Sequence, residues 1–412
     1  MTNTACHTPS GDAAQLHWSC TPTGIPVKRY LPQYGKKWFA KQKMVCSFCT
    51  KVGHTVSFCP LAPTVVSKEK QMPFMEKLLG LPRVKAQSFY GMSKEQALEA
   101  VIVEGGKLNE GNPWAASERI YDRIRRELGY WKALGASNSV LSWLGYGIPM
   151  RFVKEPKHFA FPNHKHEDHE AATYMANDMA KHIGTGCFIL APKGSVKIAN
   201  PTLIIQQDGK WRRCDDCRYG NSFQAQAHFR MASLGRDIPI TTKVDDEAIT
   251  RDLEKTYYKI PMSEEARAYM AFEWAGKYYL SMVMLFGMCQ APLYFTRICK
   301  DIAAFFGALK IPNLNYIDDW YWPVKKGSIP DMSGFVLKLF TRLGWSFNKK
   351  GEEGVMVKLL GFVIDLVGRK FVVPKEKRTT TLTLLNEHNL RVSVGRVEVK
   401  PLQRMRGRPQ GH

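Results

Sequence analysis

The sequence lacks any run of residues long and apolar enough to span a membrane. Its longest uncharged stretch, residues 278–296, is interrupted by Gly287, Gln290 and Pro292, whereas a spanning helix needs ~20 predominantly apolar residues. The N-terminus also lacks the basic and then apolar order of a secretory signal. We therefore expect an intracellular protein without a membrane partner, and the sequence leaves nucleus and cytoplasm open.

Glycine-rich nucleotide loops of the Walker or dinucleotide type are missing, and acidic residues are scarce. The chain has 37 Asp and Glu against 59 Lys and Arg, a net charge of +22. Residues 1–59 hold seven basic and one acidic side chain, and residues 369–412 hold eleven and three. Such an excess predicts a polyanionic partner, most commonly nucleic acid. Basic termini that are merely solvated tails are the alternative.

Four residues near the N-terminus have the spacing of a metal site. Cys46, Cys49, His54 and Cys59 form the pattern C-x2-C-x4-H-x4-C. Intracellular thiols stay reduced, so these cysteines are available as metal ligands. Three thiolates and one imidazole are suited to tetrahedral Zn²⁺, and so short a segment needs the metal in order to fold. The spacing is that of the retroviral-type zinc knuckle, which binds single-stranded nucleic acid.

Two aromatic residues and a lysine lie between and beside these ligands. Phe48 and Phe58 are candidate stacking platforms for bases, and Lys51 is a candidate phosphate contact. A small hydrophobic floor under the metal is the alternative role for the two phenylalanines.

Apolar periodicity predicts where helices and strands lie. Helical spacing occurs over residues 93–103, 116–134, 167–182, 292–307 and 331–343. Two strands flank the Asp208-Gly209 dipeptide, a common hairpin signal. Asp252 is expected to end a strand, and the run LNYIDDWYW predicts a hairpin with Asp318 and Asp319 at its tip. An Asp-Asp pair in isolation is more often a solvated surface turn, because adjacent carboxylates repel each other.

The order of motifs around these aspartates is the second strong signal. Between them runs AFEWAGKYYLSMVMLFGMCQAPLYFTRICKDI, and LGWSFNKKGEEGVMVKLLGFVID follows the hairpin. This order resembles the palm of a reverse transcriptase over about residues 185–380. Upstream, GYWKALGASNSVLSWLGYGIPMRF resembles the segment that precedes the polymerase of tyrosine-recombinase (DIRS-type) retrotransposons.

The resemblance implies a two-cation site. Asp252, Asp318 and Asp319 would hold two Mg²⁺ ions, with Mn²⁺ as a substitute, about 3.5 to 4 Å apart. One ion would lower the pKa of the primer 3′-hydroxyl, and the other would neutralise the leaving pyrophosphate. Lys350 matches the lysine that protonates the pyrophosphate, although Lys349 is adjacent and the register is open.

The resemblance also implies residues that hold the nucleotide. Arg212 matches the arginine that clamps the triphosphate, and Gly287 the glycine that lets the backbone approach the nucleotide. Tyr257 matches the aromatic residue that rejects a 2′-hydroxyl by bulk; a core tyrosine is the alternative. Beside this resemblance, Lys210 and Arg213 lie nearby in the sequence and are expected to add positive charge at the phosphates.

Three residues depart from the family pattern. Leu285 stands where the family has proline, and Gln206 and Gln207 replace two phosphate-facing lysines. Losing two positive charges is expected to weaken nucleotide binding and to impair the polymerase.

These observations together predict an α+β fold with the fingers and palm of a right-hand polymerase and an antiparallel palm sheet. The expected divisions are a flexible basic arm (1–45), the zinc knuckle (46–59), a connector and helical region (60–160), fingers and palm (161–380), and a basic tail with at most the start of a thumb (381–412). The expected partners are an RNA or DNA template-primer and deoxynucleoside triphosphates, and the oligomeric state stays open.

The expected activity is RNA-directed DNA polymerisation. The main alternative is an inactive retroelement protein that binds nucleic acid through zinc, similar to a nucleocapsid. A metal-dependent nuclease is a third reading, but it does not account for Tyr257, Arg212 and the YIDD hairpin together. No carboxylate set indicates a ribonuclease H, and nothing indicates a recombinase.

Overall fold

The computed structural model of the protein describes residues 67–163, 169–207, 209–225, 229–349, 351–375, 377–379 and 382–383. Helices and strands are mixed along this part of the chain, so the predicted α+β class is confirmed. None of the helices within it is both long and apolar enough to cross a membrane. The predicted zinc knuckle, residues 46–59, lies outside the described residues, and so does Lys350.

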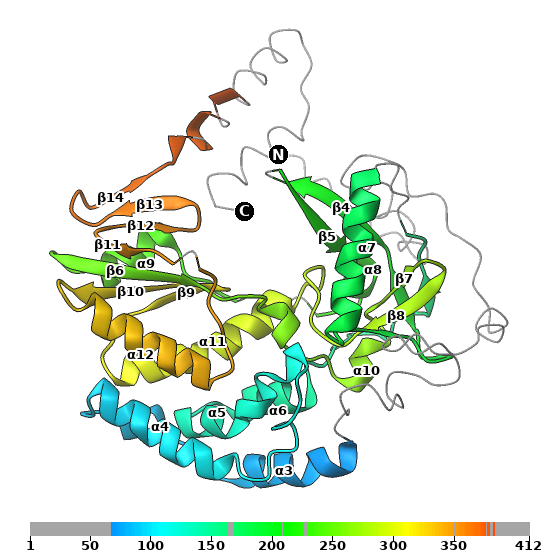
Figure 1. Ribbon diagram of the computed structural model, residues 1–412, viewed down its shortest axis with the longest axis horizontal. Helices are drawn as coiled ribbons and strands as arrows, with labels where there is room; N and C mark the ends of the chain where they lie inside the picture. Colours follow the sequence, from blue (N-terminus) through cyan, green and yellow to red (C-terminus); the bar gives the residue numbers. More distant parts are fainter. Residues whose placement is uncertain are drawn as a thin grey trace, which may run out of the picture.

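The first part of the described chain is a layer of helices along the lower side of Figure 1. Its elements are α3 (Lys68–Gly80), η2 (Ala86–Phe89), α4 (Lys94–Leu108), η3 (Ile120–Asp122), η4 (Arg125–Glu127), α5 (Leu128–Leu134) and α6 (Asn138–Tyr146). The helix predicted at residues 93–103 is confirmed by α4. It starts with a capping box, in which Ser93 Oγ accepts from the Gln96 N–H and Gln96 Oε1 accepts from the Ser93 N–H.

The prediction of helix over residues 116–134 is wrong for most of that range. Only Leu128–Leu134 is α-helical, and residues before it form two short 3₁₀ turns. The Asn109 and Asn112 side-chain amides donate to the Arg126 and Arg125 carbonyls. These bonds come from residues 17 and 13 positions earlier in the chain, and they hold the backbone in its turn just before α5.

A five-stranded sheet with the order β1-β3-β7-β8-β2 stands on one side of the molecule. Its strands are β1 (Phe159–Ala160), β2 (Phe188–Leu190), β3 (Ile198–Asn200), β7 (Ala271–Trp274) and β8 (Lys277–Ser281). The hairpin predicted around Asp208-Gly209 is formed by β4 (Thr202–Gln207) and β5 (Lys210–Asp215), with Gly209 at φ +71°. Helix α7 (His169–Gly184) packs against β2 and this hairpin.

A four-stranded antiparallel sheet with the order β11-β6-β10-β9 stands on the other side. Its strands are β6 (Asp246–Asp252), β9 (Leu314–Tyr316), β10 (Asp319–Lys325) and β11 (Glu353–Gly354). Helices α11 (Ala291–Ala308) and α12 (Ile329–Arg342) pack against it and match the two predicted helices. Gly344, at φ +83°, supplies the left-handed residue that follows the end of α12.

The central strand β10 is buried on both faces. Trp320 and Trp322 stack at 5.4 Å and pack against Phe306 and Phe340 of the two helices. Tyr321 points to the opposite face, because successive strand residues alternate. There it joins a small core shared with α9 (Leu234–Thr241) and the strands β12 (Met356–Leu359) and β13 (Phe362–Asp365).

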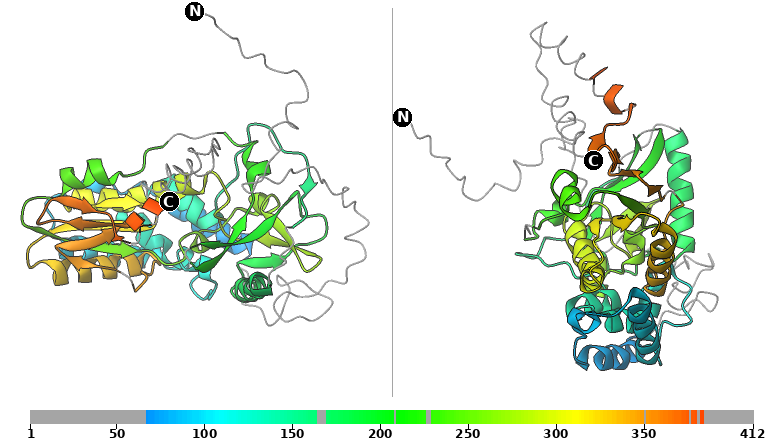
Figure 2. Two further views of the ribbon diagram at one scale, coloured as in Figure 1. Left: turned by 90° about the horizontal axis from the view of Figure 1, so that it is seen from above. Right: turned by 90° about the vertical axis from the view of Figure 1, so that its left-hand side faces the viewer.

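The remaining elements are short: α8 (Arg218–Asn221), η5 (Tyr257–Lys259), α10 (Glu264–Arg267) and β14 (Lys370–Val372), which pairs with β13. One hydrophobic core runs from Phe74 in α3 to Trp345 after α12. The right-hand view of Figure 2 shows the helical layer beneath the sheets. The helical region therefore packs against the sheets in the same hydrophobic core.

Candidate functional site

Asp252 and Asp319 face each other across the centre of the four-stranded sheet. Asp252 is the last residue of β6, Asp319 is the first of β10, and the two are direct cross-strand partners. The Leu253 N–H donates to the Asp318 carbonyl at 3.0 Å, which makes this a non-hydrogen-bonded pair. In such pairs the Cα atoms are only ~4.5 Å apart and the side chains share one face.

Asp318 lies in the tight turn that joins β9 to β10. The turn passes through Ile317 at φ +54°, which is unusual for a β-branched residue and signals a strained backbone. The Asn315 side-chain amide donates to the Ile317 carbonyl at 2.7 Å and holds the turn. The predicted hairpin with two aspartates at its tip is therefore present in the structure.

The three aspartates affect one another electrostatically. Burial raises the pKa of Asp318 to about 6, with a further contribution from the negative charge of Asp252. Burial raises the pKa of Asp319 to about 7, and the charges of Asp318 and Asp252 add to it. Clustered carboxylates that disfavour their own ionisation are expected to gain from a nearby cation.

The side chains of these aspartates are not arranged as a ready three-ligand metal site. Within the described part of the chain, no group of three or more His, Cys, Asp or Glu side chains is positioned to hold a metal ion. The chemistry of the donor set, oxygen ligands only and mutually repelling, does fit a hard cation such as Mg²⁺.

Asn348 was missed by the sequence reasoning, although it lies two positions before Lys350 in SFNKK. Its side-chain amide donates to Asp252 Oδ2 at 2.7 Å, and its backbone N–H donates to the Asp252 carbonyl at 2.8 Å. Two residues earlier, the Ser346 carbonyl accepts from the Glu254 N–H at 2.8 Å. The segment after α12 thus fixes the end of β6 and one carboxylate oxygen of Asp252.

A buried lysine anchors this same segment. Lys259 is fully buried, and its Nζ donates to Ser346 Oγ at 2.6 Å. Ser346 Oγ in turn donates to Glu254 Oε2 at 3.1 Å. Burial lowers the pKa of Lys259 to about 8, and Arg123 lowers it further. No sequence pattern pointed to Lys259, because only the fold brings it to Ser346.

Tyr257 lies beside the aspartates and is also a core residue. It is 4% exposed and packs against Phe286 at 4.7 Å and Phe295 at 5.8 Å between ring centroids. Burial raises its pKa, and the nearby charge of Asp318 adds to the effect. Both readings of this residue, core tyrosine and neighbour of the reacting groups, are therefore compatible with the structure.

Gly287 lies where two segments approach closely. A Cβ atom at this position would clash with the carbonyl oxygen of Asp215 at the end of β5. The Asn221 amide donates to the Gly287 carbonyl at 2.8 Å and its Oδ1 accepts from the Cys289 N–H at 3.0 Å. The glycine thus allows the loop before α11 to contact the base of the β4–β5 hairpin. Leu285, in the same loop, is buried in the core.

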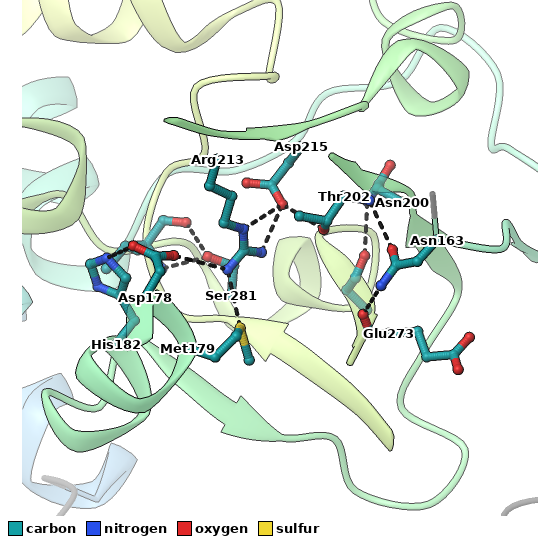
Figure 3. Close-up of polar contacts among 12 residues, drawn as sticks. Asn163, Asp178, Met179, His182, Asn200, Thr202, Arg213, Asp215, Glu273 and Ser281 are labelled. Atoms are coloured by element: carbon teal, nitrogen blue, oxygen red, sulfur yellow. Dashed lines mark hydrogen bonds and ion pairs between the residues drawn. The ribbon is translucent and has the colours of Figure 1, made fainter. Parts of the chain in front are cut away.

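Lys210 and Arg212 lie on the β4–β5 hairpin, which is a separate sheet from the one that bears the aspartates (Figure 1). Lys210 and Arg212 are both exposed. The neighbour Arg213 points to the opposite face, where it binds Asp215 at 2.7 Å and lies over the Phe272 ring at 4.0 Å. Figure 3 shows Arg213 reaching toward both Asp215 and Asp178.

Figure 3 also shows Asp178 between Arg213 of the hairpin and His182 of α7. His182 pairs with Asp178 at 3.2 Å and stacks on the Tyr258 ring at 4.2 Å and 7°. The base of the hairpin, α7 and η5 are therefore held as one packed unit.

Comparisons with known proteins add partial likenesses of fold. No family model and no curated protein matches the chain. A native prototype foamy virus protease-reverse transcriptase matches with a TM-score of 0.44 and 19% identity, covering 55% of this chain and 29% of that one. A foamy viral protease-reverse transcriptase in complex with RNA/DNA hybrid gives 0.46 and 16%, covering 79% and 39%.

A third structure, a foamy viral protease-reverse transcriptase dRH in complex with double-stranded DNA, gives a TM-score of 0.46 and 18% identity, covering 79% of this chain and 50% of that chain. The chain thus spans between 29% and 50% of the length of these structures.

The raised pKa of Asp319 predicts a pH-dependent gain in stability for Asp319→Asn. The stability penalty for ionising this carboxyl is absent below pH ~4, where the group is neutral in both the folded and the unfolded state. It grows as the pH rises toward about 7, the pKa in the folded state, and is fully present above that pH. Without divalent cations, the variant should be more stable than the wild type by about 2 kcal/mol at pH 8, and equal to it near pH 4. Urea unfolding at both pH values measures the difference.

Asp245→Asn is the matched control, because Asp245 is exposed and its left-handed backbone, φ +64°, suits asparagine. A gain at pH 8 that is the same for both variants would contradict the coupling among the three carboxylates.

Proposed function

We propose that the chain carries the nucleotidyl transfer centre of a retroelement RNA-directed DNA polymerase. The observation that carries the proposal is the meeting of Asp252, from one end of β6, with Asp318 and Asp319 in the β9–β10 hairpin. These segments are more than sixty positions apart in the chain. A bare surface turn would not place a third carboxylate on the same face of the sheet.

The cation chemistry belongs to the proposal. Asp252, Asp318 and Asp319 would hold Mg²⁺, or Mn²⁺ in its place. Bound there, the ions would activate the primer 3′-hydroxyl and neutralise the pyrophosphate. Asn348 holds one oxygen of Asp252 and would thereby orient this carboxylate as a cation ligand.

Other residues would bind and orient the substrates. Tyr257 would present its ring beside the incoming sugar, close to Asp318. Arg212 and Lys210, on the β4–β5 hairpin, would contact the triphosphate, with guanidinium suited to paired phosphate bonds. Gly287 would keep the loop before α11 close to the backbone of that hairpin. Lys350 would donate a proton to the pyrophosphate, and an RNA or DNA template-primer would be the polymeric partner.

Primer extension on an RNA template tests this proposal. Asp318→Asn removes one charged ligand and should reduce incorporation of deoxynucleotides by more than ~100-fold in Mg²⁺. Asp245→Asn, an exposed position, should extend the primer like the wild type. The measurement is product length on a denaturing gel over a range of Mg²⁺ and Mn²⁺ concentrations.

Equal incorporation of deoxynucleotides by Asp318→Asn and the wild type would contradict the proposed polymerase centre. Failure of the wild type under all cation conditions would favour the second function, a zinc-dependent nucleic-acid-binding protein that keeps this fold as a scaffold. The replacements Gln206 and Gln207, and the net charge of +22, are the features that favour this alternative.

Asn348→Ala tests the positioning of Asp252. Loss of the bond to Asp252 Oδ2 should raise the Mg²⁺ concentration needed for half-maximal extension by roughly 10-fold, since residues that orient a metal ligand typically affect metal affinity by 10- to 100-fold. Asn138→Ala, an exposed asparagine on α6, is the control. An unchanged Mg²⁺ requirement would show that Asn348 does not orient the ligand.

We also propose that Cys46, Cys49, His54 and Cys59 bind one Zn²⁺ ion and that this knuckle, with Phe48, Phe58 and Lys51, contacts single-stranded nucleic acid. The spacing C-x2-C-x4-H-x4-C is the support.

Cys49→Ser should abolish zinc binding by the purified full chain, and it should weaken binding to a single-stranded RNA by roughly 10-fold. Metal content by mass spectrometry and fluorescence anisotropy provide the two readouts. Cys20→Ser, outside the motif, should keep its zinc. Equal zinc content in both variants would refute the ligand set.

A further inference from the structure

A cavity of about 670 Å³ lies between α3, η3, α6 and α10, elements that carry none of the proposed catalytic residues. In Figure 1, α3 and α10 lie at the lower side of the molecule, whereas β9 and β10 lie above the helical layer. The volume is within the range of ~300 to 1,000 Å³ that is usual for sites of small organic ligands.

Buried polar groups form one wall of the cavity. Arg119, Asp122 and Arg125 line it and are each at most 6% exposed. Arg125 binds Asp122 Oδ1 at 2.9 Å, and Ser117 Oγ donates to Asp122 Oδ2 at 2.6 Å. Arg119 donates to the Tyr121 hydroxyl at 2.6 Å. Both carboxylate oxygens of Asp122 therefore already accept bonds from protein groups.

Arg267 of α10 lines the same cavity and forms no ion pair among the described residues. Its Nε donates to the Met262 carbonyl at 3.1 Å. The carboxylates that influence it are bound to other cations, Asp122 to Arg125 and Glu264 to Lys68 at 2.6 Å. Burial lowers the pKa of Arg267, and the charge of Arg125 lowers it further. The surroundings therefore disfavour the positive charge of Arg267, yet its guanidinium group stays protonated.

The balance of charge in the wall indicates what would bind there. Asp122 balances Arg125, whereas Arg267 has no ion pair among the described residues and so leaves a positive charge in the wall. The acidic residues Glu69, Glu264 and Glu265 stand at the exposed rim, where solvent and salt screen them. A phosphate monoester carries about −1.5 to −2 charges at pH 7 and accepts paired bonds from guanidinium.

The rest of the cavity is suited to the organic part of such a ligand. Met72, Tyr146 and Met282 line it and supply apolar surface, and thioether and aromatic groups make favourable contacts with flat rings. We propose that this cavity binds a small organic phosphate of the nucleoside monophosphate class, with its phosphate against Arg267 and its ring against these apolar side chains. The proposal is independent of the polymerase assignment.

Isothermal titration of the full chain tests the proposal, with EDTA present so that the proposed cation site does not contribute. Adenosine 5′-monophosphate should bind, inorganic phosphate should bind more weakly, and adenosine should not bind. Arg267→Gln should weaken nucleotide binding by roughly 10-fold or more, because a charge-assisted bond is lost. Arg236→Gln, an exposed arginine on α9, should bind like the wild type. Asp318→Asn should also keep its binding.

A second measurement avoids reliance on the folding of Arg267→Gln. Phenylglyoxal modification of Arg267 in the wild type, quantified by mass spectrometry, should slow severalfold when adenosine 5′-monophosphate is present. Equal binding of adenosine and its monophosphate, equal binding by Arg267→Gln and the wild type, or an unprotected Arg267 would each overturn the proposal. If primer extension fails while adenosine 5′-monophosphate still binds, the result contradicts only the proposed polymerase function and not the proposed site at Arg267.

Discussion

The register between β6 and β10 is the constraint on which the candidate site depends. It places Asp252 directly opposite Asp319 and brings the turn residue Asp318 next to both. A shift by one residue would send Asp252 to the other face of the sheet. The register is fixed from both sides, because Trp320 and Trp322 pack against the helices while Tyr321 packs into the small core on the opposite face. Hydrophobic burial thereby holds together three carboxylates that repel each other.

Polar contacts then set the end of β6 more finely than packing does. Asn348 binds the carbonyl and one carboxylate oxygen of Asp252, and Ser346 binds the next part of the strand. Lys259 holds Ser346 from inside the core. A buried ammonium group with a lowered pKa carries a cost in stability. Its bond to the segment that positions Asp252 gives a reason for its presence.

The other half of the molecule is held by a different kind of contact. Arg213, clamped between Asp215 and aromatic rings, fixes the base of the β4–β5 hairpin. The absence of a side chain at Gly287 lets the loop before α11 touch the same base. The hairpin that carries Arg212 is therefore packed against its neighbours at its base. The cavity around Arg267 lies in the supporting helical layer, apart from both features.

Local patterns in the sequence were enough to predict the hairpin at Asp318, the end of a strand at Asp252 and the helix α11. Each depends on periodicity or turn chemistry within a few residues. The same reasoning failed over residues 116–127, where Asn109 and Asn112 capture backbone carbonyls, and it missed Asn348 and Lys259. The sequence by itself determined which residue types occur and how each segment folds locally. Only the tertiary structure decided which of them meet, because pairing between distant segments depends on register and packing that no local pattern encodes.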